Sequence, residues 1–166
     1  MSLPDLAAIL WRQREMLERL SYRLECEQLL LAAGRTRWLA VATSEVELLL
    51  EELRIIELQR ASAADRAAAE LGLPAGATLE QLAAGAQPPW TGVLLDHRSA
   101  LLSLTTELGA LAETNRHLMD AGMRAVEAAL AQIGLHTQGD ADGYDATGRR
   151  GRRRTGYGPA AVDQAL

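Results

Sequence analysis

Leucine recurs at alternating intervals of three and four residues near the start of the chain. With two polar residues included, the series is Leu3, Leu6, Leu10, Gln13, Leu17, Leu20, Leu24, Glu27 and Leu31. A repeat of 3.5 residues puts these side chains on one stripe of an α-helix and favours left-handed packing against a second helix. The spacing therefore predicts a long helix over about residues 5–33, in which the two polar residues can fix the packing register.

A second stripe with the same spacing follows Gly34, a residue type that commonly ends helices. Its members are Leu39, Ala42, Val46, Leu49, Leu53, Ile56, Arg60, Ala63 and Ala67. The stripe predicts a second helix over about residues 36–71, which the break at Gly34 turns back into an antiparallel hairpin. The alanine-rich end of this helix either lets a neighbour approach closely or faces solvent.

Glycine and proline interrupt the helical pattern over residues 72–92. Within this connector, Thr78 and Gln81 have the spacing of a capping box, which predicts a short helix over about residues 79–84. A third stripe then predicts a long helix over about residues 93–133. Its members are Leu94, Leu101, Leu104, Leu108, Leu111, Asn115, Leu118, Gly122, Val126, Ala129 and Ile133. Gly109 and Gly122 each cost about 1 kcal/mol relative to alanine inside a helix, which indicates close packing or a hinge.

The composition changes at Gly134, since seven of the fourteen glycines lie in the last 33 residues. This stretch offers too little apolar area to offset the entropy of ordering it, so we expect residues 134–166 to form a flexible, disordered Gly/Arg-rich tail. Residues 1–133 are rich in leucine and alanine and lack phenylalanine. We therefore predict an all-α fold: an elongated bundle of an antiparallel hairpin and a third long helix.

Side chains suited to catalysis or metal binding are sparse. The chain has three histidines and no Glu-x-x-His pair, so the di-iron bundle pattern is absent. Glu113 and His117 are four residues apart, and we interpret them as a surface pair. Cys26 is the single cysteine and cannot form an internal disulfide. We predict no catalytic residue, no cofactor and no metal.

Charge and hydropathy bear on the partners and the location. The net charge of -5 argues against a domain that grips nucleic acid. No apolar run approaches the roughly 20 residues of a membrane span, and the first residues do not read as a signal peptide. We therefore expect a cytoplasmic protein with no membrane partner. Five arginines within residues 149–154 could contact phosphates, with Tyr144 and Tyr157 beside them, but we prefer to interpret this block as a solvated basic tail.

The third predicted helix broadens its apolar stripe towards its end with Leu118, Met119, Met123, Val126 and Leu130. Methionine is adaptable and suits a surface that accepts a partner helix. Core packing accounts for any one of these residues, but as a group they are the best candidate for a partner-binding face.

Four segments, taken together, resemble the FlgN family of flagellar export chaperones. Residues 22–31 carry a run of Leu and Glu, and residues 65–72 lead into Thr78-Leu79-Glu80-Gln81-Leu82. Residues 111–119 contain an Asn-x-x-Leu element at Asn115, and residues 144–148 form Tyr-x-x-x-Gly. The arginine block departs from the family pattern, and Tyr157-Gly158-Pro159 looks like a second copy of the tail element.

The resemblance implies a helical chaperone that binds the C-terminal helices of the hook-associated proteins, the FlgK-like and FlgL-like subunits. It also implies that the chaperone prevents their premature assembly and delivers them to the flagellar type III export apparatus. The residues expected to hold the client are Leu111, Asn115, Leu118, Met119, Gly122, Met123, Val126, Leu130 and Tyr144.

One hypothesis of another class stays open at this stage. A self-associating coiled-coil protein, with an Arg-rich tail that binds nucleic acid, fits the same stripes. An apolar groove could also be filled by a second copy of the chain, as a homodimer.

Overall fold

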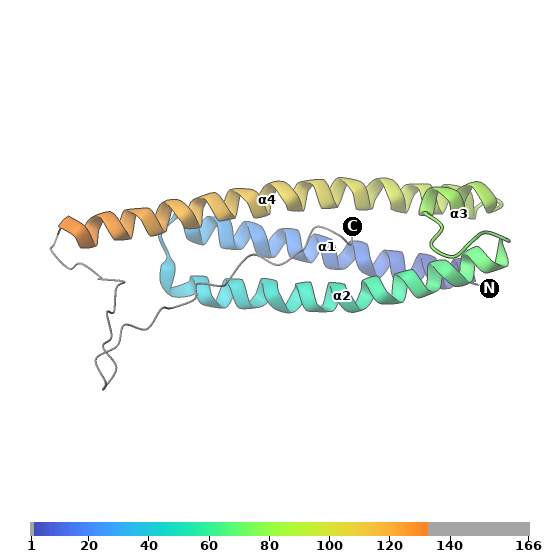
Figure 1. Cartoon of the computed structure of the whole chain (residues 1–166), viewed down its shortest axis with the longest axis horizontal. Coiled ribbons are helices and arrows are strands. Elements are labelled where there is room, and N and C mark those ends of the chain that lie inside the picture. The colour runs from blue at the N-terminus through green and yellow to red at the C-terminus, as the bar shows by residue number, and fades with distance from the viewer. Residues whose placement is uncertain (1, 133–166) are drawn as a thin grey trace, which may run out of the picture. The chain divides into compact units, whose positions relative to one another are not determined.

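The computed structural model describes residues 2–132, which form helices joined by short connections (Figure 1). The elements are α1 (Ser2–Ala32), the 3-10 turn η1 (Thr36–Trp38), α2 (Leu39–Glu70), α3 (Leu79–Gly85) and α4 (Trp90–Gln132). No strand occurs in this range, so the all-α prediction is confirmed. The chain divides into two compact units, Met1–Val126 and Glu127–Leu166. The predicted tail of residues 134–166 and Ile133 lie outside the described residues.

The hairpin of α1 and α2 is closed by the glycine that the sequence singled out. Gly34 has φ 64°, a left-handed conformation that glycine adopts without steric cost. The backbone N–H of Gly34 donates to Leu31 at 3.1 Å, and that of Arg35 donates to Leu30 at 2.9 Å. These two bonds satisfy the last carbonyls of α1 in a Schellman motif. The chain then reverses through η1, and α2 packs back along α1.

The far end of α2 stops in the same way, at Gly72 with φ 69°. The following connector is tied back to α2, because the N–H of Gly76 donates to the Asp65 carboxylate at 2.8 Å. The predicted capping box is present at the start of α3: the N–H of Thr78 donates to Gln81 Oε1 at 2.9 Å, and the N–H of Gln81 donates to Thr78 Oγ1 at 3.2 Å. Local sequence signals thus place the short helix.

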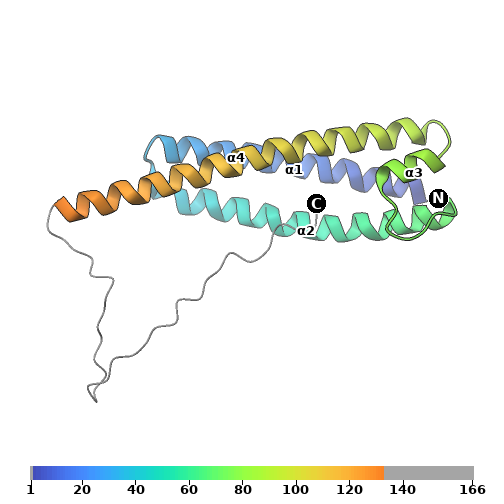
Figure 2. The ribbon, with the colours of Figure 1, turned by 45° about the horizontal axis from the view of Figure 1, so that its top comes forward.

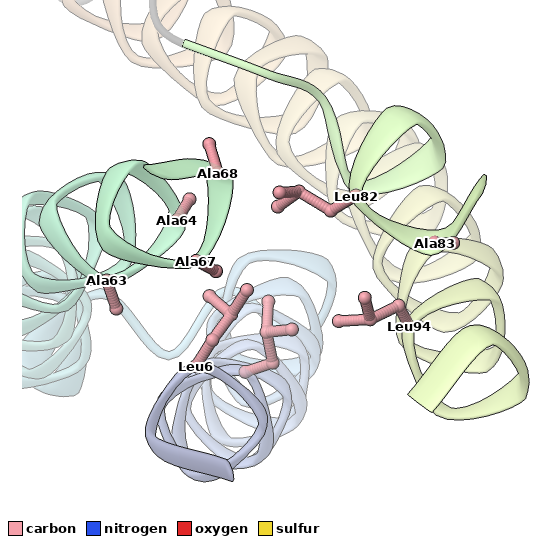
Figure 3. Close-up of a cluster of buried hydrophobic side chains, with 9 residues drawn as sticks. Leu6, Ala63, Ala64, Ala67, Ala68, Leu82, Ala83 and Leu94 are labelled. Carbon is pink, nitrogen blue, oxygen red and sulfur yellow. The ribbon is translucent and has the colours of Figure 1, made fainter. Parts of the chain in front are cut away.

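Alanines of α2 form a close-packed core with α3, α1 and α4 (Figure 3). Ala63, Ala67 and Ala68 have no exposed surface. Leu82 points from α3 towards these alanines, and Leu94 points from α4 towards α1. Of the two readings that the sequence left open, close approach of a neighbour is therefore correct, because only a small side chain leaves room for α3.

A second core lies nearer the hairpin turn and contains the predicted leucine stripes. Its buried members are Met16, Leu17, Leu20, Leu24, Val46, Leu49, Ile56 and Leu108. The helix α4 lies beside α1 and runs in the same direction, as Figures 1 and 2 show. It begins at Trp90, three residues before the expected Val93. Pro88 and Pro89 precede its first turn, where the missing N–H of proline has no helical partner to lose.

Candidate functional site

A buried polar layer joins three helices near the hairpin turn. The side-chain amide of Asn115 on α4 donates to the Leu24 carbonyl at 2.9 Å and to Glu27 Oε2 at 3.0 Å. Thr43 on α2 donates its hydroxyl to Glu27 Oε1 at 2.8 Å. Asn115 and Glu27 are 2% and 4% exposed. The layer therefore fixes the register of α4 against both arms of the hairpin, as a buried polar residue can do.

A second buried polar residue has the same role farther along α1. Gln13 donates to Glu57 Oε2 on α2 at 3.0 Å, and Glu57 also pairs with Arg60. Both polar interruptions of the first stripe, Gln13 and Glu27, thus make hydrogen bonds between helices. The expectation that they can set the register fits these contacts.

The helix α1 ends just beyond the Asn115 layer, at Ala32. Asn115 and Glu27 are 88 positions apart. Because α4 and α1 run in the same direction with the same rise per residue, Ala32 at the end of α1 lies level with Asp120. The helix α4 continues past this level, so Gly122, Met123 and Val126 have no α1 residue beside them.

Exposure along α4 follows this register. Leu111 and Leu118 are half-buried, and the Met119 side chain lies at the surface. Met123 and Val126 are 64% and 59% exposed. A Cβ added at Gly122 would meet no atom within 4 Å. The apolar stripe that is core at Leu108 has therefore become open surface by Met123.

The remaining predicted site residues are placed differently. Asn115 is buried and uses its amide within the bundle, so it would reach a partner only if α4 separated from α1. Leu130 is half-buried and belongs to the second unit. Tyr144 lies outside the described residues, as does the arginine block.

The hairpin turn adds residues that the sequence reasoning missed. Trp38 is 49% exposed, and the Arg37 guanidinium lies 4.5 Å from the centre of its ring. Leu31 and Leu39, on either side of the turn, are half-buried. The sequence signal that could have identified this surface is Trp38, which lies close to Arg35 and Arg37 in the break between two helices. We define the open end as these hairpin residues together with the α4 face: Leu31, Arg37, Trp38, Leu39, Leu118, Met119, Gly122, Met123 and Val126.

A second, shallower surface lies between α1 and α2. Two open grooves there are lined by Ile9, Arg12, Glu15, Met16, Arg19, Glu52, Ile55, Ile56, Leu58, Gln59, Ser62 and Arg66. Two of the lining side chains, Ile55 and Leu58, are large, apolar and exposed. Arg12 and Arg19 belong to these grooves and not to the open end, which makes them a useful control below.

A buried histidine lies between α1 and α4, away from both surfaces. His97 is 1% exposed, and its ring packs edge-on against Trp11 with centroids 4.9 Å apart. Arg14 lies over Trp11 and pairs with Asp96 at 3.0 Å. Burial lowers the pKa of His97, the positive charge of Arg14 lowers it further, and Asp96 acts in the opposite direction. His97 is therefore a packing residue, and its surroundings favour the neutral form of the ring.

The other titratable side chains form no catalytic arrangement among residues 2–132. His117 pairs with Glu113 at 3.0 Å on the surface, as expected, and Glu113 also binds Arg116. Cys26 is a free, half-buried thiol. Within the described range, no group of three His, Cys, Asp or Glu side chains could hold a metal ion. Nor is any described helix both long enough and apolar enough to cross a membrane.

Comparisons with known proteins agree with this geometry. The family model described as FlgN protein matches residues 1–152, which is most of the chain. No curated protein and no solved structure matches. The matched range includes the hairpin, the connector, the whole of α4 and the tail element at Tyr144.

Proposed function

The chain belongs to the FlgN family of flagellar export chaperones, and we propose that it binds the C-terminal helices of hook-associated proteins at its open end. The observation that supports this most directly is the exposed apolar face of α4 beyond Asn115. Monomers rarely leave a contiguous apolar face on a rigid element in water, and such faces commonly mark binding surfaces. The expected occupant is a helix with one apolar face, because a helical groove accepts residues at intervals of three and four.

The chemistry of the open end suits reversible binding. Met119 and Met123 have unbranched, polarizable side chains that adapt to different partner surfaces. Gly122 has no side chain, so a partner backbone can approach α4 closely at this point. The Asn115 layer holds α4 to the hairpin immediately before the exposed face. The face is thus presented on an anchored helix, which lowers the ordering cost of binding.

The biological consequence follows from what the client would otherwise do. A subunit helix with an exposed apolar face associates with other subunits before export. Covering that face in the cytoplasm prevents premature assembly, and release at the type III export apparatus returns the helix to the subunit. In this proposal FlgK-like and FlgL-like subunits are the clients, and Tyr144 in the adjoining tail contributes to the client site.

Titration calorimetry of the purified chain with purified hook-associated subunits tests the proposal. The double variant Met123→Asp/Val126→Asp places two charges on the exposed face, where neither wild-type side chain supports the fold. We expect affinity to fall at least tenfold, about 1.4 kcal/mol, while the circular dichroism spectrum stays helical.

Leu95→Asp/Leu102→Asp provides the matched control, since both residues are exposed on α4 but lie far from the open end. We expect its affinity to equal that of the wild type. Equal losses in both double variants would place the client elsewhere on the helix. Measuring the mass of the free protein over a range of concentrations shows whether it forms a homodimer. If Met123→Asp/Val126→Asp disrupts such a dimer and Leu95→Asp/Leu102→Asp does not, the occupant of the open end is a second copy of the chain.

A further inference from the structure

We propose that the open end selects a client helix with carboxylates beside its apolar face, and that Arg35 and Arg37 bind those carboxylates. This inference rests on the proposed function and adds the chemistry of the client. It also gives the open end a preference for the charge of its client, which the apolar residues alone do not provide.

Two arginines at the hairpin turn have no acidic partner in the part of the chain that the structure describes. Residues 28–44 contain Arg35 and Arg37 and no Asp or Glu. Among residues 2–132, no carboxylate lies within ion-pair distance of Arg35 or Arg37. Their guanidinium groups are therefore available to a partner.

This basic end contrasts with the rest of the described chain. The segment of α2 from Glu45 to Glu57 contains five glutamates and one arginine, Arg54. Six of the twelve arginines in residues 2–132 have a carboxylate partner, for example Arg23 with Glu45 at 2.9 Å and Arg98 with Glu80 at 3.1 Å.

Within the same residues, Arg12, Arg19 and Arg66 also lack a carboxylate partner. However, Glu15 and Glu52 line the grooves that contain these arginines, whereas residues 28–44 contain no acid. The hairpin turn is therefore the basic part of the open end, and its charge favours an acidic occupant.

Arg37 is the best-placed of these groups. Its guanidinium stacks on the Trp38 ring, which holds the planar group in one orientation while its edge N–H groups stay free. An arginine edge matches a carboxylate with two parallel hydrogen bonds. Trp38 offers an apolar ring beside it, and tryptophan and arginine are the residue types that most often dominate binding energy at interfaces.

Charge also decides between a client helix and a second copy of the chain. Two open ends brought together would set arginines against arginines around the same apolar face, and like charges at close range cost several kcal/mol. A helix with flanking Glu or Asp side chains removes that repulsion. The occupant favoured by these contacts is therefore an acidic-flanked amphipathic helix.

The first experiment measures the affinity of hook-associated subunits for Arg35→Gln/Arg37→Gln and for the control Arg12→Gln/Arg19→Gln. Both variants remove two surface arginines, but the control pair lies in the grooves between α1 and α2. We expect the first variant to bind about tenfold more weakly and with a shallower salt dependence between about 50 and about 200 mM salt. The control should stay within about twofold of the wild type, a ratio worth less than 0.5 kcal/mol by the same relation.

Equal losses in the two variants, or no loss in either, would overturn the inference while leaving the proposed function intact. Arg37→Lys refines the result, because lysine keeps the charge but not the planar fork or the stacking. We expect an intermediate affinity for this variant. Full wild-type affinity would show that charge alone acts and would remove the role assigned to Arg37.

The second experiment does not depend on the hook-associated subunits. Two short helical peptides carry the same leucine stripe, flanked by Glu in one and by Lys in the other. We expect the wild type to prefer the Glu-flanked peptide by at least tenfold and Arg35→Gln/Arg37→Gln to lose that preference.

If the natural subunits fail to bind while this preference holds, the proposed function fails and the charge selectivity stands. Equal binding of both peptides would overturn the selectivity. Displacement of the Glu-flanked peptide by duplex DNA at lower concentration than by the acidic peptide itself would overturn it too, by making nucleic acid the occupant.

Discussion

The side-chain amide of Asn115 on α4 and the Glu27 carboxyl on α1 are joined by a 3.0 Å hydrogen bond inside the bundle. The two residues come from stripes that are otherwise apolar, and they lie 88 positions apart in the chain. Within residues 2–132, their contact marks the last level at which a side-chain hydrogen bond joins α4 to the hairpin. Packed bundle and open end therefore meet at this pair.

Replacing Asn115 by Ala should lower the free energy of unfolding by about 1–3 kcal/mol, because buried oxygens of Glu27 and Leu24 lose a donor. Urea denaturation measures the change. Thr114→Ala is the neighbouring control, since the Thr114 hydroxyl bonds only the Ala110 carbonyl of its own helix. In a double-mutant cycle, Glu27→Gln/Asn115→Ala should lose less than the sum of the single changes. Strict additivity would show that the pair does not act as a unit.

Stability should fall as the pH drops below about 6.5, the ordinary pKa of histidine. Burial lowers the pKa of His97 in the folded chain, so the unfolded chain binds more protons between the two pKa values. The stabilisation is therefore complete above the unfolded pKa and declines towards the folded one.

Thermal unfolding at several pH values between about 7.5 and about 5.5, the range in which histidine ordinarily changes its charge, measures this effect. His97→Met should flatten the pH dependence, since methionine fills the site next to Trp11 without titrating. A wild-type slope in His97→Met would assign the titration to another group.

Enlarging Ala67 to leucine should destabilise the bundle by about 1–3 kcal/mol, because a fully buried position packed against α3 cannot accept three more carbons without moving its neighbours. The same change at the exposed Ala61, on the same helix, should have little effect. Denaturation of both variants provides the comparison. Equal stability of the two would mean that α3 does not pack on these alanines as Figure 3 shows.

Gly122→Ala should raise the stability of the free protein and weaken client binding. Both Gly122 and Gly109 lie within α4 and have room for a Cβ, so alanine should gain up to about 1 kcal/mol at either position. Only Gly122 belongs to the open end, where a methyl group would stand between α4 and a closely packed client.

Gly109→Ala is therefore the control that gains stability and keeps client affinity. Thermal unfolding and calorimetry, run on the same samples, separate the two effects. If Gly122→Ala binds hook-associated subunits as tightly as Gly109→Ala does, close approach at this glycine is not part of the client site.

The three- and four-residue spacing of leucine determined the helices and the faces they bury. Gly34, Gly72 and the Thr78–Gln81 pair determined where helices end and begin, because these signals act within a few residues. The sequence also named Gln13 and Glu27 as register residues and the end of α4 as a partner-binding face. It did not identify Thr43 as a partner of Glu27 or His97 as a buried residue, because their neighbours come from other helices.

Only the tertiary structure decided which part of each stripe is covered. Leu108 and Val126 belong to the same apolar stripe of α4, yet the first is buried and the second is open. The difference arises because α1 ends at Ala32 while α4 continues, and relative helix length and register are properties of the packed bundle. The same register places Asn115 inside the bundle and leaves Met123 available to a partner, although the two residues lie only two helical turns apart.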